Sequence, residues 1–382
     1  MPAFTGPQRS ASHRCEQLMK PEEIALQFAT RGTIREVVPH GGGHINDSYR
    51  LVNASEDQPD YLLQRINHYV FRNVDLLMKN MALVTEHIYR VQQERGTEDL
   101  HRRTLTIVPT REGKSYLRVT DPEDSYWRVL NFIEDHQVFE KAPDPGIAYE
   151  GARMFGDFTR MLSGLDASRL GDTIPRFHDL KWRISNLRKS IEEDTAGRVK
   201  FVEDEIRYIE SSLSLMSTVQ ELGEKGAIPS RVTHNDTKIS NVLFDGNRRG
   251  LCVIDLDTVM PGYVHFDFGD GIRTFTNTGE EDDRDPDNVR MDLDIYRAFA
   301  SGFLESTREV LTRAELDSLV YAGVLFPYEQ GVRFLTDYLS GDVYYKTRYK
   351  EHNLVRTRAQ LKLAQDGESK LEQCRKIIRE LT

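Results

Sequence analysis

The sequence predicts an α+β protein of two lobes, in which a small antiparallel sheet is followed by a larger, mainly helical part. Three observations lead to this fold class. At 382 residues the chain exceeds the size at which a single hydrophobic core stops growing. Strand-like runs fill its first part, and beyond residue 134 apolar residues recur at helical spacing. We therefore expect a flexible tail over 1–20 and lobes over 21–134 and 135–382.

Composition narrows the possible functions. Asp and Glu outnumber Lys and Arg by 61 to 51, so nothing recommends a nucleic acid or an anionic membrane as partner. The cysteines Cys15, Cys252 and Cys374 are far apart and lack CxxC spacing, which favours reduced thiols. No apolar run approaches the roughly 20 residues of a membrane span, and the N-terminus does not resemble a signal peptide. We expect a cytoplasmic monomer.

A glycine-containing hairpin is expected near the start of the small lobe. Strand-like runs over 34–38 and 48–52 flank the segment Pro-His-Gly-Gly-Gly-His-Ile-Asn-Asp at 39–47. A Walker-type phosphate loop must be followed by a helix, and here a strand follows. The glycines, Gly42 and Gly43 in particular, therefore suit a loop that lies over nucleotide phosphates, as in kinases. A plain tight turn would explain them as well.

The third expected strand of the small lobe carries a glutamine at a position of interest for nucleotide binding. In kinases this strand carries a lysine that reaches the nucleotide phosphates. Here the strand is expected over 61–66, ahead of a helix over 71–90, and the matching position is Gln64. We therefore take Gln64 as a nucleotide contact, which leaves open which cation replaces the lysine.

The small lobe is expected to end in a hinge. Further strand-like runs cover 105–108, 115–119 and 126–134, and the last of them leads into a short polar connector. In a two-lobed kinase such a connector reads the adenine edge through backbone N–H and C=O groups. The expected adenine contacts are Asn131, Phe132 and Ile133.

Helical periodicity dominates the rest of the chain. The acidic run at 280–289 lacks the spaced oxygen ligands and the glycine of an EF-hand loop, so we expect a solvated loop there rather than a calcium site. Helices are expected over 147–163, 196–225, 293–306, 313–339 and 351–380.

The residues with the most chemical information lie within 231–273. Asp236 is followed five residues later by Asn241, and Asp255 ends an apolar run. This is the layout of a kinase catalytic loop followed by its metal-binding carboxylate. Two short apolar strands separate Asn241 from Asp255, and as neighbours they would bring both side chains to one edge. The simpler alternative is that these polar residues only form turns between a helix and a strand.

Phosphoryl transfer requires a protein mainly to place groups and to neutralise charge. Asp236 is expected to accept a hydrogen bond from the attacking hydroxyl and to take its proton. Asn241 and Asp255 would each give an oxygen to Mg²⁺, an ion that prefers few protein ligands. Asp267 would hold the loop by accepting hydrogen bonds from its backbone N–H groups. The residues expected to support the site are His234, Asp257 and Asp267.

These segments resemble a known superfamily. Residues 234–241, His-Asn-Asp-Thr-Lys-Ile-Ser-Asn, and 253–257, Val-Ile-Asp-Leu-Asp, resemble the aminoglycoside phosphotransferase and choline kinase superfamily, which has a bilobal protein-kinase-like fold. The likeness runs from about residue 30 to residue 360. The segments that resemble the bacterial N-acetylhexosamine 1-kinases more narrowly are 43–47, 63–67, 255–262 and 331–339.

That resemblance implies ATP and Mg²⁺ as cofactors. It also implies transfer of the γ-phosphoryl group to the anomeric hydroxyl of a sugar, N-acetylglucosamine or N-acetylgalactosamine. Asp236 would be both the base and a sugar ligand, with Arg333 and Tyr344 as a sugar-binding pair and His44 as a contact from the glycine loop. Without the resemblance, Arg333 reads as a cation on a helix surface and Tyr344 as a packed aromatic.

Two other functions stay open. A kinase of another small hydroxyl compound would differ in its pocket, with an aromatic cage for choline or a broad acidic surface for an aminoglycoside; homoserine is a further acceptor of this class. From a different class, the chain would be a nucleotide-binding regulator without turnover. The joint presence of Asp236, Asn241 and Asp255 argues against a regulator.

Overall fold

The computed structural model describes residues 19–41, 45–120 and 123–382. Contacts divide the chain into two compact units: the segment up to Tyr69 with Ile107–Phe132, and Val70–Thr106 with Ile133–Thr382. The first unit contains an antiparallel sheet and the second is mainly helical, so the predicted α+β fold class is confirmed. Among the described residues, no helix has both the length and the apolar composition needed to cross a membrane.

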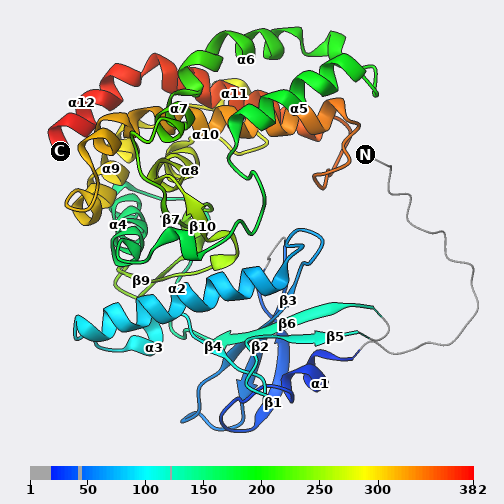
Figure 1. The fold of residues 1–382 in the computed structure, drawn as a ribbon, viewed down its shortest axis with the longest axis vertical. Helices are drawn as coiled ribbons and strands as arrows, with labels where there is room; N and C mark the ends of the chain where they lie inside the picture. The colour runs from blue at the N-terminus through cyan, green and yellow to red at the C-terminus, as the bar shows by residue number, and fades with distance from the viewer. Residues whose placement is uncertain (1–18, 42–44, 121–122) are drawn as a thin grey trace, which may run out of the picture. The chain divides into compact units, whose positions relative to one another are not determined.

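The first unit is built around one sheet (Figure 1). Five strands follow the order β1-β2-β3-β6-β4, and β5 pairs with β6 off this path; every pairing is antiparallel. The predicted hairpin is present, with Pro39 opposite Tyr49, although its tip at 42–44 lies outside the described residues. The elements are α1 (Pro21–Ala25), β1 (Ile34–Pro39), β2 (Asp47–Asn53), β3 (Tyr61–Ile66), β4 (Ile107–Val108), β5 (Leu117–Val119) and β6 (Ser125–Asn131).

One face of this sheet rests on a hydrophobic core. Leu63 of β3 and Val129 of β6 are fully buried there and pack with residues of α1. Successive residues of a strand point to opposite faces, so Gln64 and Arg128, which are paired in the register, lie together on the other face.

Two helices between the strands belong to the second unit. α2 (Val74–Glu94) packs against α4 (Pro145–Leu162), and α3 (Leu100–Arg103) contacts both α2 and a short strand of that unit. Asn80 of α2 donates to the carbonyl oxygens of Gly171 and Val259 at 2.7 and 3.0 Å. These contacts place Val70–Thr106 in the second unit, whereas a single lobe was expected over 21–134. That this lobe binds the nucleotide stays a prediction.

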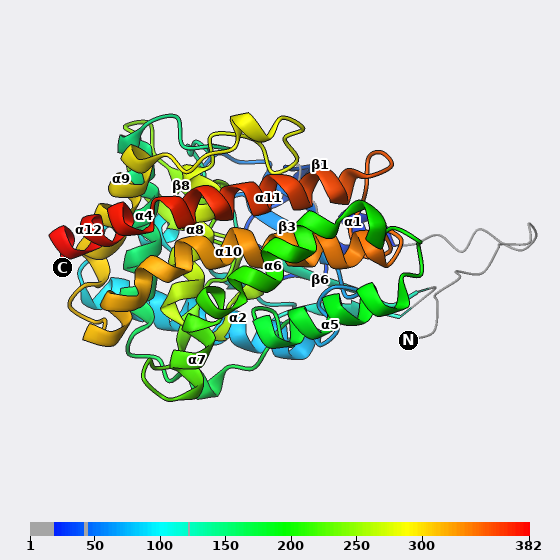
Figure 2. The same cartoon turned by 90° about the horizontal axis from the view of Figure 1, so that it is seen from above.

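A long helix, α10, runs through the second unit and contacts α5, α6, α8 and α11 (Figure 2). It covers Arg313–Leu339, the predicted range, and begins with a capping box between Thr312 and Glu315. The remaining helices are α5 (Leu180–Glu193), α6 (Glu203–Met216), α7 (Thr218–Glu224), α8 (Val264–Thr276), α9 (Leu293–Thr307), α11 (His352–Ser369) and α12 (Leu371–Leu381), with short 3₁₀ turns at Ala167–Arg169, Val199–Phe201, Ile239–Asn241, Leu256–Thr258 and Pro286–Asn288.

Two predicted helices are wrong in extent. The range 196–225 contains a 3₁₀ turn and then α6 and α7, which meet at Ser217, and the range 351–380 breaks at Lys370. Ser217 keeps helical backbone angles, so apolar residues recur at helical spacing on both sides of it. The sequence pattern therefore shows no break between α6 and α7. α5 and α8 lie in segments for which the sequence pattern predicts no helix.

The glycines of α8 explain why it was missed. Glycine lowers helix propensity, and α8 contains two, Gly269 and Gly271. A Cβ at Gly269 would lie 2.6 Å from the backbone oxygen of Ala322 in α10, and one at Gly271 would lie 2.1 Å from the ring of Phe299 in α9. These glycines therefore permit the close approach of three helices.

Candidate active site

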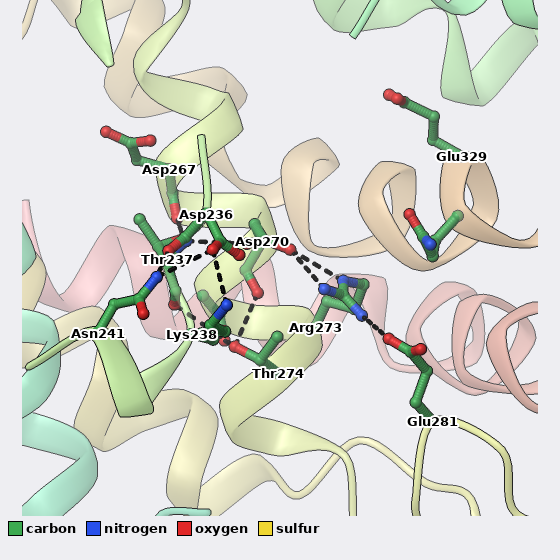
Figure 3. A network of polar contacts seen from close by, with 12 residues as sticks. Asp236, Thr237, Lys238, Asn241, Asp267, Asp270, Arg273, Thr274, Glu281 and Glu329 are labelled. Atoms are coloured by element: carbon green, nitrogen blue, oxygen red, sulfur yellow. Dashed lines mark hydrogen bonds and ion pairs between the residues drawn. The ribbon is translucent and has the colours of Figure 1, made fainter. Parts of the chain in front are cut away.

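The sequence motif of the second unit forms a loop between two small antiparallel ladders. Figure 3 shows the loop residues Asp236, Lys238 and Asn241. β7 (Arg231–Thr233) pairs with β10 (Met260–Gly262), and β8 (Val242–Phe244) pairs with β9 (Gly250–Val253). Val242 lies opposite Val253, so the residues that precede β8 and follow β9, Asn241 and Asp255, come to one edge. This is the arrangement expected from the two apolar strands.

Helix α8 holds the loop through two carboxylates one turn apart. Asp267 accepts hydrogen bonds from the backbone N–H groups of His234 and Asn235 at 2.9 and 2.8 Å, the geometry expected of it. Asp270 accepts the backbone N–H of Thr237 at 2.9 Å. Burial raises the pKa of Asp267 to about 6, against the lowering effect of His234 and of the two backbone hydrogen bonds. The loop is thus fixed by groups that belong to one rigid element.

His234 is fully buried and supports the loop from within. Its Nε2 lies 2.9 Å from the carbonyl oxygen of Ile254, so Nε2 donates, and its Nδ1 accepts the backbone N–H of Asp236 at 3.3 Å. The edges of the Phe155 and Phe158 rings pack against the imidazole. Both ring nitrogens are thus engaged by the backbone, so His234 holds the loop in place.

Asp236 is held by two partners within the loop. Its Oδ2 lies 2.8 Å from Lys238 Nζ and accepts a hydrogen bond from Asn241 Nδ2 at 2.9 Å. Burial acts to raise the pKa of Asp236, but the charge of Lys238 and the hydrogen bonds from Lys238 and Asn241 outweigh it, so the pKa lies below its usual range. Asp236 is therefore a carboxylate at neutral pH, with 27% of its side chain exposed to receive a hydroxyl.

The donor set at Asn241 and Asp255 fits a divalent cation that takes few protein ligands. Asn241 directs Nδ2 to both the carbonyl oxygen and Oδ2 of Asp236, at 2.9 Å each, so its Oδ1 is the atom turned outward. Asp255 lies two residues beyond the end of β9 and adopts a left-handed backbone conformation, with φ 61°. An amide oxygen and a carboxylate are ligands that Mg²⁺ prefers. Asp257, two residues after Asp255, is buried.

Arg333 lies on α10 within a group of polar side chains. Its guanidinium stands 5.1 Å from the ring centroid of Phe177 and 5.9 Å from that of Tyr345. Glu329, one helical turn earlier, bonds through Oε1 to His178 Nδ1 at 3.1 Å. The buried side-chain atoms of this group that have no hydrogen-bond partner among the described residues are His178 Nε2, Arg183 Nε, Glu329 Oε2, Arg333 Nε and Tyr345 Oη.

Tyr344, the predicted partner of Arg333, is 68% exposed, and its ring packs on that of Tyr345. Tyr345 is the member of this pair that contacts Arg333. Sequence reasoning did not single out Tyr345, because two adjacent tyrosines in a loop give no periodicity that would tell which of them turns inward.

The acidic loop at 280–289 is largely exposed, as expected, and two of its carboxylates also pair with residues from distant segments. Glu281 pairs with Arg273 of α8, and Asp282 Oδ2 lies 2.8 Å from Nε2 of the fully buried His352. Arg273 in turn pairs with Asp270 at 2.8 Å, so the acidic loop is linked to the helix that holds the catalytic loop (Figure 3). The sequence shows the carboxylates, but their cationic partners come from distant segments.

The residues of the first unit that were expected to contact the nucleotide or the sugar either lie outside the described residues or are engaged within the sheet. Gly42, Gly43 and His44 lie outside the described residues. Gln64 is engaged within the sheet, where its Oε1 accepts from Arg128 and its Nε2 donates to Ser48.

The expected hinge residues already have intramolecular partners. Asn131 ends β6, and the backbone N–H of Phe132 donates to the carbonyl oxygen of Asp60 at 3.2 Å. In the second unit, Ile133 is buried and its carbonyl oxygen accepts from His136. Recognition of adenine by these three residues stays a prediction.

Known proteins resemble this chain in sequence and in fold. Residues 36–300 match the family described as the phosphotransferase enzyme family. The chain is similar to the solved structure of a microcompartment-associated aminopropanol kinase at 16% identity and a TM-score of 0.57, which covers 92% of this chain and 97% of that one. An amicoumacin kinase in complex with AMP-PNP, Ca²⁺ and its ligand matches at 14% identity and a TM-score of 0.56, over 94% of this chain and 92% of that one.

A third similar structure is an aminoglycoside phosphotransferase from Alicyclobacillus acidocaldarius, at 14% identity and a TM-score of 0.56, which covers 96% of this chain and 98% of that one. At these identities the likeness shows the fold alone. The kinase-like character of the predicted α+β fold is confirmed.

Proposed function

The chain belongs to the phosphotransferase enzyme family, and on this premise we propose that it is an ATP- and Mg²⁺-dependent kinase of N-acetylhexosamines. Its product would be the sugar 1-phosphate, formed at the anomeric hydroxyl. The observation that carries the proposal is Asp236, an ionised carboxylate held by Lys238 and Asn241 on a loop that α8 fixes from behind.

Asp236 accepts the hydrogen bond of the acceptor hydroxyl and so points the oxygen at the γ-phosphorus. As the new O–P bond forms and the bond to ADP breaks, the hydroxyl proton passes to the Asp236 carboxylate. A carboxylate of lowered pKa is a weak base, which suits a loose transition state in which the proton moves late. An anomeric hydroxyl is more acidic than an ordinary alcohol and reduces the demand further.

Asn241 and Asp255 would hold Mg²⁺, which when bound neutralises charge on the phosphate oxygens. Lys238 adds a second source of positive charge beside Asp236. Burial acts to lower the pKa of Lys238, but the charges of Asp236 and Asp255 raise it above its usual value, so the ammonium keeps its proton.

A sugar suits the group of polar side chains around Arg333. Buried donors and acceptors without partners cost free energy unless a ligand or water completes them. This group offers donors on Arg183 and Arg333, an acceptor on Glu329 and a hydroxyl on Tyr345, the mixture that a polyhydroxyl compound with an amide can satisfy.

The same contacts weigh against two alternative acceptors. A choline pocket needs an open aromatic cage, and here the guanidinium of Arg333 stands against the rings of Phe177 and Tyr345 and would repel a second cation. An aminoglycoside pocket needs unpaired carboxylates, whereas Glu281 and Asp282 are paired with Arg273 and His352.

A panel of acceptors tests the proposal. Purified protein with ATP and Mg²⁺ is offered free hexosamines, their N-acetyl forms, aminoglycosides, homoserine, choline and aminopropanol, and the phosphorylated carbon is located by NMR. We expect turnover with an N-acetylhexosamine and phosphate at C1. Phosphate on another carbon, or turnover only with an amino alcohol, would overturn the sugar assignment, and ATP binding without any turnover would favour a regulator.

A further inference from the structure

The loop that follows α10 is anchored by one residue of that helix, Asp337. The backbone N–H of Asp342 donates to the carbonyl oxygen of Asp337 at 2.8 Å. The next three backbone N–H groups donate to the Asp337 carboxylate at 3.0, 2.8 and 3.0 Å; they belong to Val343, Tyr344 and Tyr345. Asp337 is buried, so a single side chain fixed within α10 holds four consecutive residues of the loop.

The side chains of this loop supply little anchorage of their own. Val343 and Tyr344 are 78% and 68% exposed. Asp342 has a left-handed backbone conformation, with φ 62°, which is unfavourable for most residues other than glycine. Asn353 adds a polar contact, since its Nδ2 donates to Asp337 Oδ2 and to Asp342 Oδ1 at 2.8 and 2.9 Å. Hydrogen bonds to Asp337, rather than burial of apolar surface, therefore determine the path of residues 342–345.

Tyr345 is the side chain that this path turns inward. Its ring packs on that of Phe334, with the centroids 4.8 Å apart, and it stands beside the partly exposed Arg333. Arg333 lies four residues after Glu329 and four before Asp337, so these three side chains share one face of α10. One rigid helix thus carries both Arg333 and the carboxylate that sets Tyr345 against it.

We propose that Asp337 is a positioning residue of the acceptor site, which acts through Tyr345 on Arg333. The inference rests on the proposed binding of a sugar by Arg333. The rings of Tyr345 and Phe177 both lie within about 6 Å of the guanidinium, a distance at which aromatic rings attract a cation. Without the Asp337 carboxylate, the N–H groups of 343–345 would bond to water, and the Tyr345 ring would no longer hold Arg333 in one orientation.

Steady-state kinetics with ATP, Mg²⁺ and N-acetylglucosamine or N-acetylgalactosamine test this role. Asp337→Asn keeps the size of the side chain but replaces one acceptor oxygen by an amide donor. We expect the KM of the sugar to rise about 3- to 10-fold, the effect of one lost interaction of this kind, while kcat and the KM of ATP stay within a factor of about two. The loop that carries Asp236 keeps its hydrogen bonds to α8, which is why kcat is spared. An unchanged sugar KM, or a fall in kcat as large as the rise in KM, would overturn the inference.

A double-mutant cycle shows whether Asp337 acts through Tyr345. Tyr345→Ala alone should also raise the KM of the sugar. In that background Asp337→Asn should change the sugar KM by no more than about two-fold, because the ring that it positions is gone. If the two changes instead multiply in full, Asp337 acts by another route and the proposed role is wrong.

Ile378→Ala is the control for a general loss of stability. Ile378 is buried in α12, which contacts α10 and lies at the other end of the second unit from the loop after α10 (Figure 2). This change should lower the free energy of unfolding and leave both KM values unchanged. An equal rise of the sugar KM in Ile378→Ala would mean that the KM follows stability alone, which contradicts a positioning role.

Asn353→Ala keeps the inference testable if Asp337→Asn does not fold. It removes a donor that holds Asp337 Oδ2 but leaves the carboxylate, so the sugar KM should rise by a smaller factor with kcat unchanged. No rise in the sugar KM would count against the inference. Negative results with these variants leave the proposed kinase intact, whereas a wild-type protein that phosphorylates neither sugar would overturn the proposed function and this role together.

Discussion

At the scale of single residues, the proposal places Asp236 at the acceptor hydroxyl and not at the nucleotide base, so a change there should affect turnover separately from nucleotide binding. Asp236→Asn keeps the shape and removes the charge that accepts the proton. Loss of a positioned base costs typically 10²- to 10⁴-fold in rate, so we expect kcat to fall by about that factor while Mg-ATP affinity stays near wild type. Steady-state kinetics and calorimetry measure the two quantities.

Asp204→Asn is a suitable control for this change, since Asp204 is 88% exposed and paired only with Arg207 at 2.8 Å. It should change neither quantity. Turnover within a few-fold of wild type in Asp236→Asn would show that another group takes the proton.

Asp267 makes a pH-dependent contribution to stability. Its pKa of about 6 in the folded protein is raised above the ordinary value of about 3.9, so the folded state binds the extra proton between these values. Its stabilising contribution is therefore complete below about pH 4 and is lost as the pH rises through 6. Relative to Asp267→Asn, the wild-type free energy of unfolding should fall by roughly 2 to 3 kcal/mol across this window.

Urea unfolding of both proteins at a series of pH values measures this difference. Comparing slopes rather than absolute stabilities removes the constant cost of replacing a double hydrogen-bond acceptor by an amide. A difference that does not change between pH 4 and 6.5 would mean that Asp267 is ionised throughout, held so by the two backbone N–H groups.

The residues found from sequence are those that a short local motif defines. Asp236, Asn241 and Asp255 stand at fixed spacing on a loop and two short strands, so local order predicts their meeting. Lys238 lies inside the same motif, but its bond to Asp236 depends on the turn that the loop makes. Arg128 and Arg273 could not be found this way, because their partners come from strand register and from a distant loop.

At the scale of elements, α8 holds the loop that contains Asp236 in position. The packing of α8 depends on Gly269. A Cβ there would lie 2.6 Å from the backbone oxygen of Ala322, an atom that cannot move without α10. Gly269→Ala gains helix propensity of about 1 kcal/mol, but the overlap typically costs 1 to 3 kcal/mol or more. We expect a net loss of about 1 to 2 kcal/mol in the free energy of unfolding, together with reduced turnover.

Urea unfolding and kinetics on the same preparation test this expectation. Gly246→Ala is the control, because nothing lies within 4 Å of a Cβ at that position and its backbone is not left-handed. It should stay within about 0.5 kcal/mol of wild type. A Gly269→Ala protein as stable as this control would mean that α8 and α10 can separate at little cost.

Long periodic elements were predictable, and their interruptions were not. α10 matches its predicted range, because apolar residues repeat over many turns and Thr312 with Glu315 marks its start. The break falls at Lys370, whose backbone leaves the helix only slightly, with φ −103° and ψ 4°, and whose neighbours keep the apolar spacing. Such breaks depend on tertiary contacts, which the residue pattern of a single sequence does not show.

At the scale of the whole molecule, the order of the chain and its division into units do not coincide. The first unit takes its strands from two segments, and Val70–Thr106 between them belongs to the second unit. Each unit nevertheless has its own hydrophobic core, one around Leu63 and the other around Leu335. Because each unit has a separate core among the described residues, the protein need not unfold in one step.

The two tryptophans of the chain, Trp127 in β6 and Trp182 in α5, lie one in each unit and can report on them separately. Leu63 is fully buried in the first core, and Leu→Ala changes at such sites cost about 2 to 5 kcal/mol. In single-tryptophan backgrounds made by Trp→Phe replacement, Leu63→Ala should lower the urea midpoint reported by Trp127 and leave the Trp182 midpoint nearly unchanged. Leu335→Ala, fully buried in the second core, should do the reverse. Equal shifts of both midpoints in either variant would mean that the two cores unfold together as one cooperative unit.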